Sequence, residues 1–286
     1  MNRSLFKELW FKMVHSGSRM NLFIGINIAV FLLIGIIHVL EVLGGNDGII
    51  SGWITAQLAM PAYLPAFLYK FWTPFTYMFT HTEFFHILFN MLWLYWMGRI
   101  FEDFMNARQF TFTYLAGGLA GAAIFILAYN LFPVFQSSLP AALILGASAS
   151  VSAIVIATAT LVPDYSIMLL FFGEVKLKYL ALVFILMDIL SIAGNNPGGS
   201  IAHLGGALLG FVYIKQLRRG TDWSKLFKRK QKLHVIKNVQ TKSAGTATRL
   251  PDQDVIDKIL DKISKSGYES LTRQEKEQLF KASNKE

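Results

Sequence analysis

Long apolar runs constrain the fold of this chain more than any other feature. A helix needs roughly 18–20 apolar residues to cross a bilayer, and six runs reach or approach that length. They cover residues 21–43, 79–100, 110–132, 142–162, 177–192 and 199–217. Hydrophobic residues make up 53% of the chain and charged residues only 16%, unlike a soluble globular domain. The sequence therefore predicts an all-α integral membrane protein, a six-transmembrane-helix bundle with a small cytoplasmic C-terminal helical segment.

The placement of basic residues predicts how the chain crosses the membrane. Lysine and arginine gather before the first run, between the second and third, before the fifth and after the sixth. The other connections, near 44–78, 133–141 and 193–198, carry only Lys70. Because basic loops stay on the cytoplasmic side, we expect both termini in the cytoplasm and a multi-pass location in the plasma (inner) membrane. No small-residue cleavage site follows the first run, which predicts an uncleaved signal anchor.

Two features of composition exclude classes of function. The chain has no cysteine, which rules out disulfides, thiolate catalysis and cysteine-bound zinc. The net charge of +9 could indicate nucleic-acid binding, but the basic residues follow the topology described above. We expect the basic cluster at 225–232 to face anionic lipid headgroups and expect no nucleic-acid partner. Nothing in the sequence sets an oligomeric state.

The chain divides into four predicted segments. Residues 1–20 form an amphipathic surface segment, with Leu5, Leu9 and Met13 on one face. Residues 21–217 form the membrane domain, 218–250 a basic linker and 251–286 a small helical hairpin. Within the membrane domain, the connection 44–78 is unusually apolar and aromatic, and its prolines prevent one long helix.

The tail carries clear helix signals. Ile256, Ile259, Leu260 and Ile263 follow helical spacing. Gly267 is expected to end that helix, and Thr272 with Glu275 forms a capping box that opens the second.

Four polar side chains fall at a similar depth in three of the runs. His86 and Asn90 lie in the second run, Ser148 in the fourth and His203 in the sixth. All three runs start from the outer face, and a helical rise of 1.5 Å per residue places these groups roughly 6–16 Å below it. A polar group inside a membrane span is costly and by default marks a working site. We therefore expect these residues to form one site.

The residue types fit acyl transfer. A serine hydroxyl becomes a good nucleophile only when a base removes its proton, and histidine can be that base near neutral pH. Attack on an amide creates an oxyanion that needs fixed hydrogen-bond donors. His86 and Asn90 are four residues apart and so share a helix face. They could supply those donors together with a backbone N–H near Ser148.

Other polar or small residues in the runs have simpler interpretations. We expect helix packing from Ser150, Ser152, Gly206 and Gly210, and a packing role for His38. Asp188 in the fifth run could be a third member of the catalytic group, although we favour a structural hydrogen bond.

Three further interpretations are weaker. A metal bound by His81, His86 and His203 is disfavoured because the spacing of the first two does not match an i, i+4 pair and no HExxH is present. The string 146–150 half-matches the G-x-S-x-G elbow but lies in a membrane run, where that motif does not apply. A transporter is disfavoured because no repeated half or charged pathway is visible.

Three motifs in order resemble the rhomboid family of intramembrane serine proteases. "HTEFFHILFNMLWLYWMGRIFE" (81–102) resembles the family's second helix, with His81, His86 and Asn90 at the H-x4-H-x3-N positions. "GASA" (146–149) resembles the G-x-S-G signature, and "GSIAHLGGALLG" (199–210) the sixth-helix signature.

This resemblance implies a rhomboid-like bundle with a Ser–His dyad of Ser148 and His203 and no catalytic acid. His86, Asn90 and the Ser148 backbone would stabilise the oxyanion, and Gly146, Gly206 and Gly210 would pack helices near the site. The implied partners are transmembrane protein substrates and the lipid bilayer, with no cofactor or metal. Cleavage would occur near the outer face, the 44–78 loop would be half-embedded, and the fifth span would gate substrate access.

The chain departs from the family pattern at three positions. Ala149 stands where the signature has Gly, and Thr73 where many relatives have Arg. Ser152 stands where relatives often carry a Tyr stacked on the base, so His203 must be oriented by other neighbours. We predict an intramembrane serine endopeptidase. The alternative is a catalytically inactive rhomboid-like protein that binds membrane-protein clients.

Overall fold

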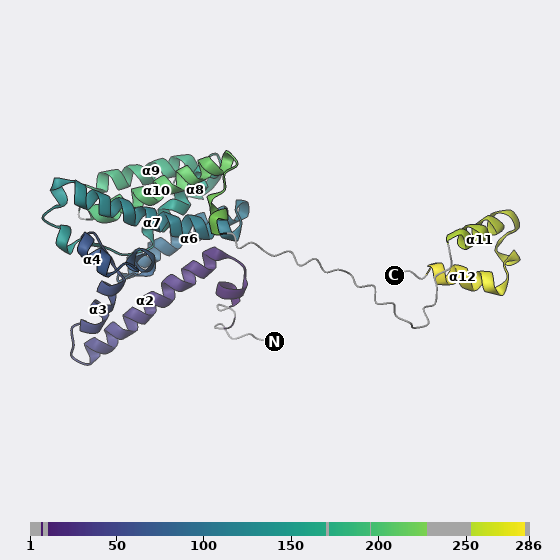
Figure 1. Cartoon of the computed structure of the whole chain (residues 1–286), viewed down its shortest axis with the longest axis horizontal. Helices are drawn as coiled ribbons and strands as arrows, with labels where there is room; N and C mark the ends of the chain where they lie inside the picture. Colours follow the sequence, from purple (N-terminus) through teal and green to yellow (C-terminus); the bar gives the residue numbers. More distant parts are fainter. Residues whose placement is uncertain (1–6, 8–10, 170–171, 195, 228–252, 284–286) are drawn as a thin grey trace. The chain divides into compact units, whose positions relative to one another are not determined.

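The computed structural model describes residues 7, 11–169, 172–194, 196–227 and 253–283. The chain divides into two compact units, Met1–Arg229 and Lys230–Glu286. The first unit is a helical bundle (Figure 1). Its long helices are α2 (Arg19–Leu43), α6 (Phe84–Phe104), α7 (Ala107–Leu131), α8 (Ser148–Leu161), α9 (Leu177–Ser191) and α10 (Pro197–Arg218). Leu5 and Leu9 of the expected amphipathic segment, and residues 228–250 of the expected linker, lie outside the described residues.

Three described helices, α2, α7 and α10, are long and apolar enough to cross a membrane by length and composition. The sequence runs assigned to the other three expected spans contain α6, α8 and α9, but α8 and α9 have only 14 and 15 residues. At 1.5 Å per residue these two helices are about 21–23 Å long. The mainly helical, membrane-embedded character of the chain is thus confirmed.

The fourth apolar run is not helical throughout, and here the sequence expectation is wrong. The run 142–162 was expected to be one span, but α8 begins only at Ser148. Leu143–Ile144 instead forms strand β2, which pairs antiparallel with β1 (Met60–Pro61) of the long connection. Gly146 then turns the chain with a φ of 115°, a value that side-chain-bearing residues rarely adopt. The serine therefore opens the helix and does not lie within it.

Helix α8 is the centre of the bundle. Its residues from Ala149 to Ala159 are all buried, as expected of a helix that is apolar on every side. Gly206 and Gly210 of α10 lie directly against the backbone carbonyls of Ala149 and Ala153. These two glycines serve close helix packing, as expected, and a β-carbon on either would collide with α8.

The connection between α2 and α6 is a chain of short elements. It contains α3 (Ile49–Leu58), β1, α4 (Leu64–Tyr69), α5 (Thr73–Thr76) and the 3₁₀ turn Tyr77–Phe79. The expectation that prolines interrupt this segment is confirmed, because Pro61 lies in β1 and prolines occupy the first turns of α4 and α5. Glu41 at the end of α2 accepts hydrogen bonds from Ile50 and Ser51 N–H, so it caps α3 and fixes where the connection starts.

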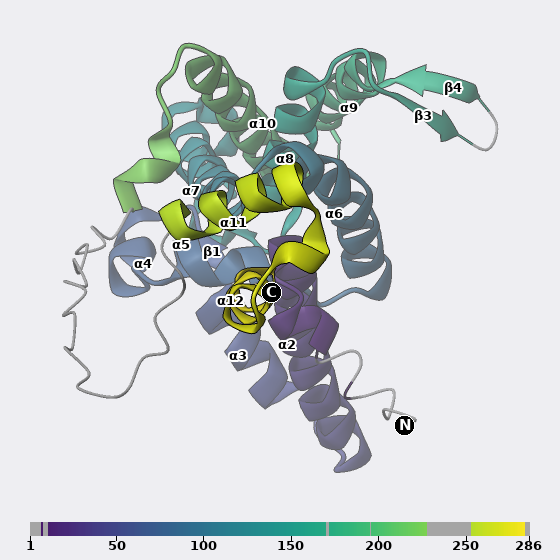
Figure 2. The same ribbon diagram turned by 90° about the vertical axis from the view of Figure 1, so that its right-hand side faces the viewer.

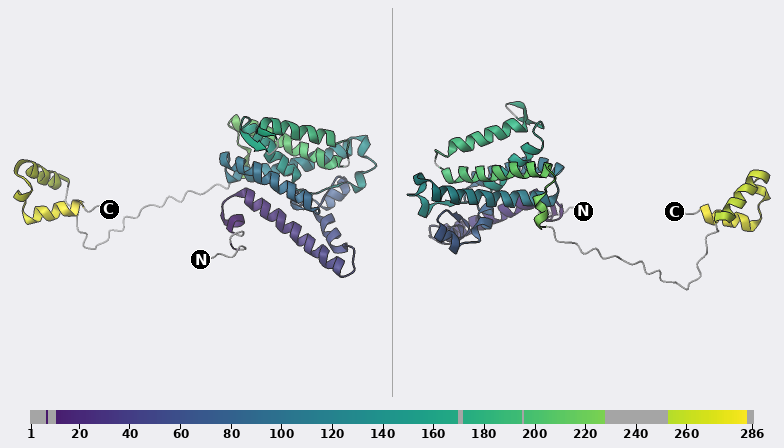
Figure 3. Two further views of the ribbon diagram at one scale, coloured as in Figure 1. Left: turned by 180° about the vertical axis from the view of Figure 1, so that it is seen from behind. Right: turned by 45° about the horizontal axis from the view of Figure 1, so that its top comes forward.

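Helix α9 occupies the edge of the bundle. A two-stranded hairpin, β3 (Ser166–Leu169) and β4 (Gly173–Lys176), leads from α8 into α9 and projects away from the helices (Figure 2). Both views in Figure 3 place α9 at the rim beside α10. Of its fifteen residues, all described, only Leu177 and Asp188 are buried.

The second unit contains α11 (Gln253–Ser266), a 3₁₀ turn (Tyr268–Ser270) and α12 (Arg273–Ser283). Gly267 follows α11 with a positive φ of 76°, which confirms the expected stop. The capping box is also confirmed. Thr272 N–H donates to Glu275 Oε2 at 2.7 Å, and Glu275 N–H donates to Thr272 Oγ1 at 3.3 Å.

The packing of α10 on α8 predicts strong sensitivity at Gly206. A Gly206→Ala change should lower the free energy of unfolding by about 1–3 kcal/mol or more, because the new methyl group has no space beside the Ala149 carbonyl. Thermal denaturation in detergent, followed by circular dichroism, measures the loss. Gly35→Ala in α2 is the matched control, since no atom lies within 4 Å of the added carbon. Equal stability of the two variants would contradict the packing described above.

The tail unit should lose stability in acid. Hydrogen bonds from the Thr272 backbone and the Lys262 ammonium hold the pKa of Glu275 at about 2, below its ordinary 4.5. A carboxylate whose pKa is lowered by folding stabilises the fold above the unfolded pKa, and that contribution disappears as pH falls through the folded value. Amide NMR signals of 253–283 in the full-length protein should therefore lose dispersion between pH 4.5 and about 2. Glu275→Gln should remove this pH dependence, whereas Glu269→Gln should retain it.

Candidate active site

Three of the four residues expected to form the site line one cavity. Ser148, His86 and His203 border a cavity of about 430 Å³ at the ends of α8, α6 and α10 where these helices begin. The remaining lining residues are Tyr77, Thr82, Glu83, Leu143, Ile144, Leu145, Ala149, Asn196, Gly199 and Ala202. The candidate nucleophile and the candidate base therefore line the same cavity.

The backbone before Ser148 is held by hydrogen bonds from neighbouring segments. Gly146 N–H donates to the Tyr77 carbonyl at 2.9 Å, and Ala147 N–H donates to His81 Nε2 at 3.2 Å. The Tyr77 hydroxyl in turn donates to the Gly118 carbonyl of α7 at 2.6 Å. Because Ser148 is the first residue of α8, its N–H has no partner inside the helix. The helix dipole also favours negative charge at this end.

The backbone of Gly146 fixes the position of the His86 side chain. A β-carbon at Gly146 would lie 2.7 Å from Cε1 and 2.8 Å from Nε2 of His86. The imidazole therefore rests directly on the glycine backbone. His81 packs edge-on against it, with ring centroids 5.0 Å apart. Gly146 was expected to pack one helix on another, but it lies in the turn before α8 and contacts an imidazole ring.

Asn90 is placed differently from the other three. It lies on α6 one turn beyond His86 and is 7% exposed, but it does not line the cavity. Its Nδ2 donates to the His86 backbone carbonyl at 2.9 Å. The expected shared face of the two residues is present, while the Asn90 amide is engaged with the backbone of its own helix.

His203 contacts Asp188, which the sequence offered as a possible third member of the catalytic group but for which a structural hydrogen bond was favoured. Its Nδ1 lies 2.7 Å from Oδ1 of Asp188 on α9. The hydrogen bond expected for Asp188 is therefore made to the candidate base itself. The signal available in the sequence was a lone acidic residue in an apolar run at the depth of the other polar groups. Ser152 provides no such contact, because its hydroxyl donates to the Ser148 carbonyl at 2.8 Å.

The alanine after the nucleophile fits between two glycines. Ala149 is 1% exposed and lies between Gly121 of α7 and Gly206 of α10. A β-carbon at Gly121 would meet the Ala149 methyl group at 2.6 Å. The departure from the G-x-S-G signature is therefore accommodated by a glycine on the neighbouring helix.

Comparison with known proteins agrees with this geometry. Residues 68–220, more than half of the chain, match the Rhomboid domain family. This chain belongs to the rhomboid family. It is 30% identical over 151 residues to RHOMBOID-like protein 12, mitochondrial, of Arabidopsis thaliana. That alignment covers 50% of this chain and 45% of the relative, so this rhomboid spans less than half the length of the plant protein. Residues 247–285 match a family of unknown function, DUF6576.

The structure also bears on the packing role expected for His38 and on the disfavoured metal site. His38 Nδ1 lies 3.2 Å from Ser51 Oγ, a contact between α2 and α3 that agrees with its expected packing role. In the part of the chain that the structure describes, no group of three or more His, Asp or Glu residues is placed to hold a metal ion.

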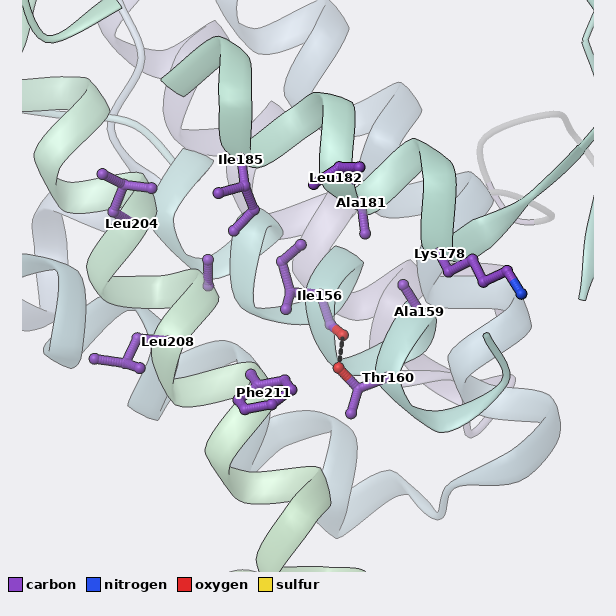
Figure 4. Close-up of a pocket in the computed structure, with 11 residues that line it drawn as sticks. Ile156, Ala159, Thr160, Lys178, Ala181, Leu182, Ile185, Leu204, Leu208 and Phe211 are labelled. Atoms are coloured by element: carbon purple, nitrogen blue, oxygen red, sulfur yellow. Dashed lines mark hydrogen bonds between the residues drawn. The ribbon is translucent and has the colours of Figure 1, made fainter. Parts of the chain in front are cut away.

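A second, apolar cavity lies between α8, α9 and α10 of the rhomboid domain. Its volume is about 480 Å³. Figure 4 shows Ile156 and Ala159 of α8, Ile185 of α9 and Phe211 of α10 around it, with Lys178 at one end. Along this stretch α9 is not packed tightly on its neighbours. The Asp188–His203 contact links α9 to α10.

The contact between Gly146 and His86 predicts a sharp effect of a single methyl group. Gly146→Ala should slow covalent labelling of Ser148 by a fluorophosphonate by at least about tenfold, because it displaces the imidazole and strains a positive-φ residue by about 1–3 kcal/mol. The labelling rate in detergent micelles measures this effect. Gly52→Ala, which meets no atom within 4 Å, should leave the rate unchanged. A Gly146→Ala variant with the wild-type rate would contradict the described geometry.

Proposed function

We propose that this rhomboid-family protein is an intramembrane serine endopeptidase that cleaves transmembrane segments of other membrane proteins near the outer face. The observation that carries the proposal is the shared cavity of Ser148 and His203, with Nδ1 of His203 already bound elsewhere. That bond leaves Nε2 as the nitrogen able to accept the serine proton. The site needs no cofactor for this chemistry.

In the proposed reaction His203 Nε2 takes the proton of Ser148 as Oγ forms a bond to the substrate carbonyl carbon. The tetrahedral intermediate then collapses, and the imidazolium returns the proton to the leaving amide nitrogen as the C–N bond breaks. Water that enters from the outer side next gives its proton to His203 and attacks the acyl-enzyme. Ser148 regains its proton when the new carboxyl product leaves.

The oxyanion would be stabilised by donors from two helices. The Ser148 N–H at the start of α8 and the His86 side chain both adjoin the cavity. Asn90 would join them by exchanging its bond to the His86 carbonyl for one to the oxyanion. Fixed donors of this kind act only when charge develops, so they lower the barrier without tightening substrate binding.

The proposed topology has six spans, formed by α2, α6, α7, α8, α9 and α10, with both termini in the cytoplasm of a cell whose plasma (inner) membrane holds the protein. The distribution of basic residues supports this orientation. The exposed edge helix α9 supports lateral access of a substrate helix on that side. Substrates would carry small or helix-destabilising residues near the cut, because a helix must unwind before its peptide bonds are exposed.

The nucleophile assignment is tested with a serine-directed covalent probe. A fluorophosphonate should label the wild-type protein, and Ser148→Ala should abolish that labelling because Oγ is the attacking atom. Ser150→Ala is the matched control. Its hydroxyl faces Met78 Sδ at 3.8 Å and lies outside the cavity, so labelling should persist.

Equal labelling of wild type and Ser148→Ala would exclude Ser148 as the nucleophile. An unlabelled wild type that leaves a model transmembrane substrate intact, yet co-purifies with it, would favour the client-binding alternative.

A further inference from the structure

An aspartate is energetically unfavourable at the position of Asp188. It lies on α9 in a run of apolar residues and is 9% exposed. Its Oδ2 is buried and has no hydrogen-bond partner among the residues that the structure describes. A carboxyl group in an apolar span is energetically costly unless it is paired. Its neighbours Met187 and Ile189 are 59% and 49% exposed, so an apolar residue would suit this helix better.

Within the described part of the chain, Asp188 bonds to the candidate base. Oδ1 lies 2.7 Å from Nδ1 of His203, within the range of short, charge-assisted hydrogen bonds. A carboxylate only accepts hydrogen bonds, so in this contact Nδ1 carries the proton and donates it. The neutral imidazole then has its lone pair on Nε2. The same carboxylate stabilises the imidazolium that forms when Nε2 takes a proton.

We infer that Asp188 is a positioning residue that completes a Ser148–His203–Asp188 arrangement by fixing the tautomer and ring orientation of His203. This inference rests on the proposed function and departs from the dyad that the motifs imply. Asp188 keeps its own charge throughout the cycle. The proton of Ser148 moves to Nε2 and from there to the leaving nitrogen, while the Nδ1–H bond to Oδ1 persists.

A purely structural role makes a different prediction from a positioning role. As an anchor between α9 and α10, Asp188 could be replaced by any residue that restores packing. As a positioning residue, it requires an acceptor opposite Nδ1. An amide at this position can also donate, which would favour the tautomer with the proton on Nε2, the atom that must accept the serine proton.

The experiment compares Asp188→Asn, Asp188→Glu and Asp188→Leu in the full-length protein in detergent, with Ile189→Ala as the control on the exposed side of α9. We expect Asp188→Asn and Asp188→Leu to lower kcat for a model transmembrane substrate by about 10²–10⁴-fold with little change in KM. Asp188→Glu should recover part of that loss because it restores a carboxylate. Asp188→Leu should lower the thermal stability, because it leaves the His203 Nδ1–H without its partner, so kcat is compared at a temperature at which every variant is folded.

A spectroscopic readout reports on the tautomer independently of activity. In protein labelled with ¹⁵N-histidine and kept at alkaline pH, the His203 signals, assigned with His203→Gln, should show a protonated Nδ1 in the wild type. Asp188→Asn should shift the population toward protonated Nε2, and Ile189→Ala should not.

The outcomes separate this inference from the proposed function. A folded Asp188→Leu with the wild-type kcat, or the same His203 tautomer in Asp188→Asn and wild type, would overturn the positioning role. A wild type that shows no Ser148-dependent activity would overturn the proposed function, and the tautomer measurement would still decide whether Asp188 fixes His203.

Discussion

The close approach of α8 to α7 and α10 is the constraint on which the rest of the domain depends. Glycines of α10 lie against the backbone of α8, and glycines of α7 lie against alanine methyl groups of α8. In a bilayer, where apolar lipid tails compete with apolar side chains, such van der Waals contact is a principal source of helix association. Because α8 begins with Ser148 and α10 carries His203 two turns from its start, the same packing brings the two residues to one cavity. Stability and site geometry thus arise from one set of contacts.

Two of the site residues lie where helices begin, because Ser148 is the first residue of α8 and His86 the third of α6. The chain before α8 is extended, pairs with the long connection at β1, and turns at Gly146. This arrangement leaves the first N–H groups of α8 unpaired within the helix and directs them toward the cavity end of the bundle. The backbone N–H groups of Gly146 and Ala147 donate to the Tyr77 carbonyl and to His81 Nε2, so irregular backbone is tolerated inside an apolar domain.

The edge helix α9 contacts the candidate base. It is largely exposed, borders an apolar cavity, and reaches α10 through the Asp188–His203 contact. A displacement of α9 by more than about an ångström would stretch a 2.7 Å hydrogen bond beyond its useful range. The position of α9 and the orientation of the imidazole are therefore physically coupled in this fold.

The sequence by itself determined the membrane class, the order of the helices, the stop and the cap in the tail, and the three motifs that bring Ser148, His86 and His203 to one level. These features are local, because hydropathy, glycine and capping patterns affect only residues close to them in the sequence. The tertiary structure decided what depends on neighbours distant in the chain. It showed that the fourth run starts as a strand because β1 is available to pair with it, and that Gly121 accommodates Ala149. It also showed that Asn90 bonds to its own helix and that Asp188 reaches His203. A lone acidic residue in an apolar run can be recognised from the sequence as energetically unfavourable. Only the packing of α9 beside α10 shows which side chain offsets that cost.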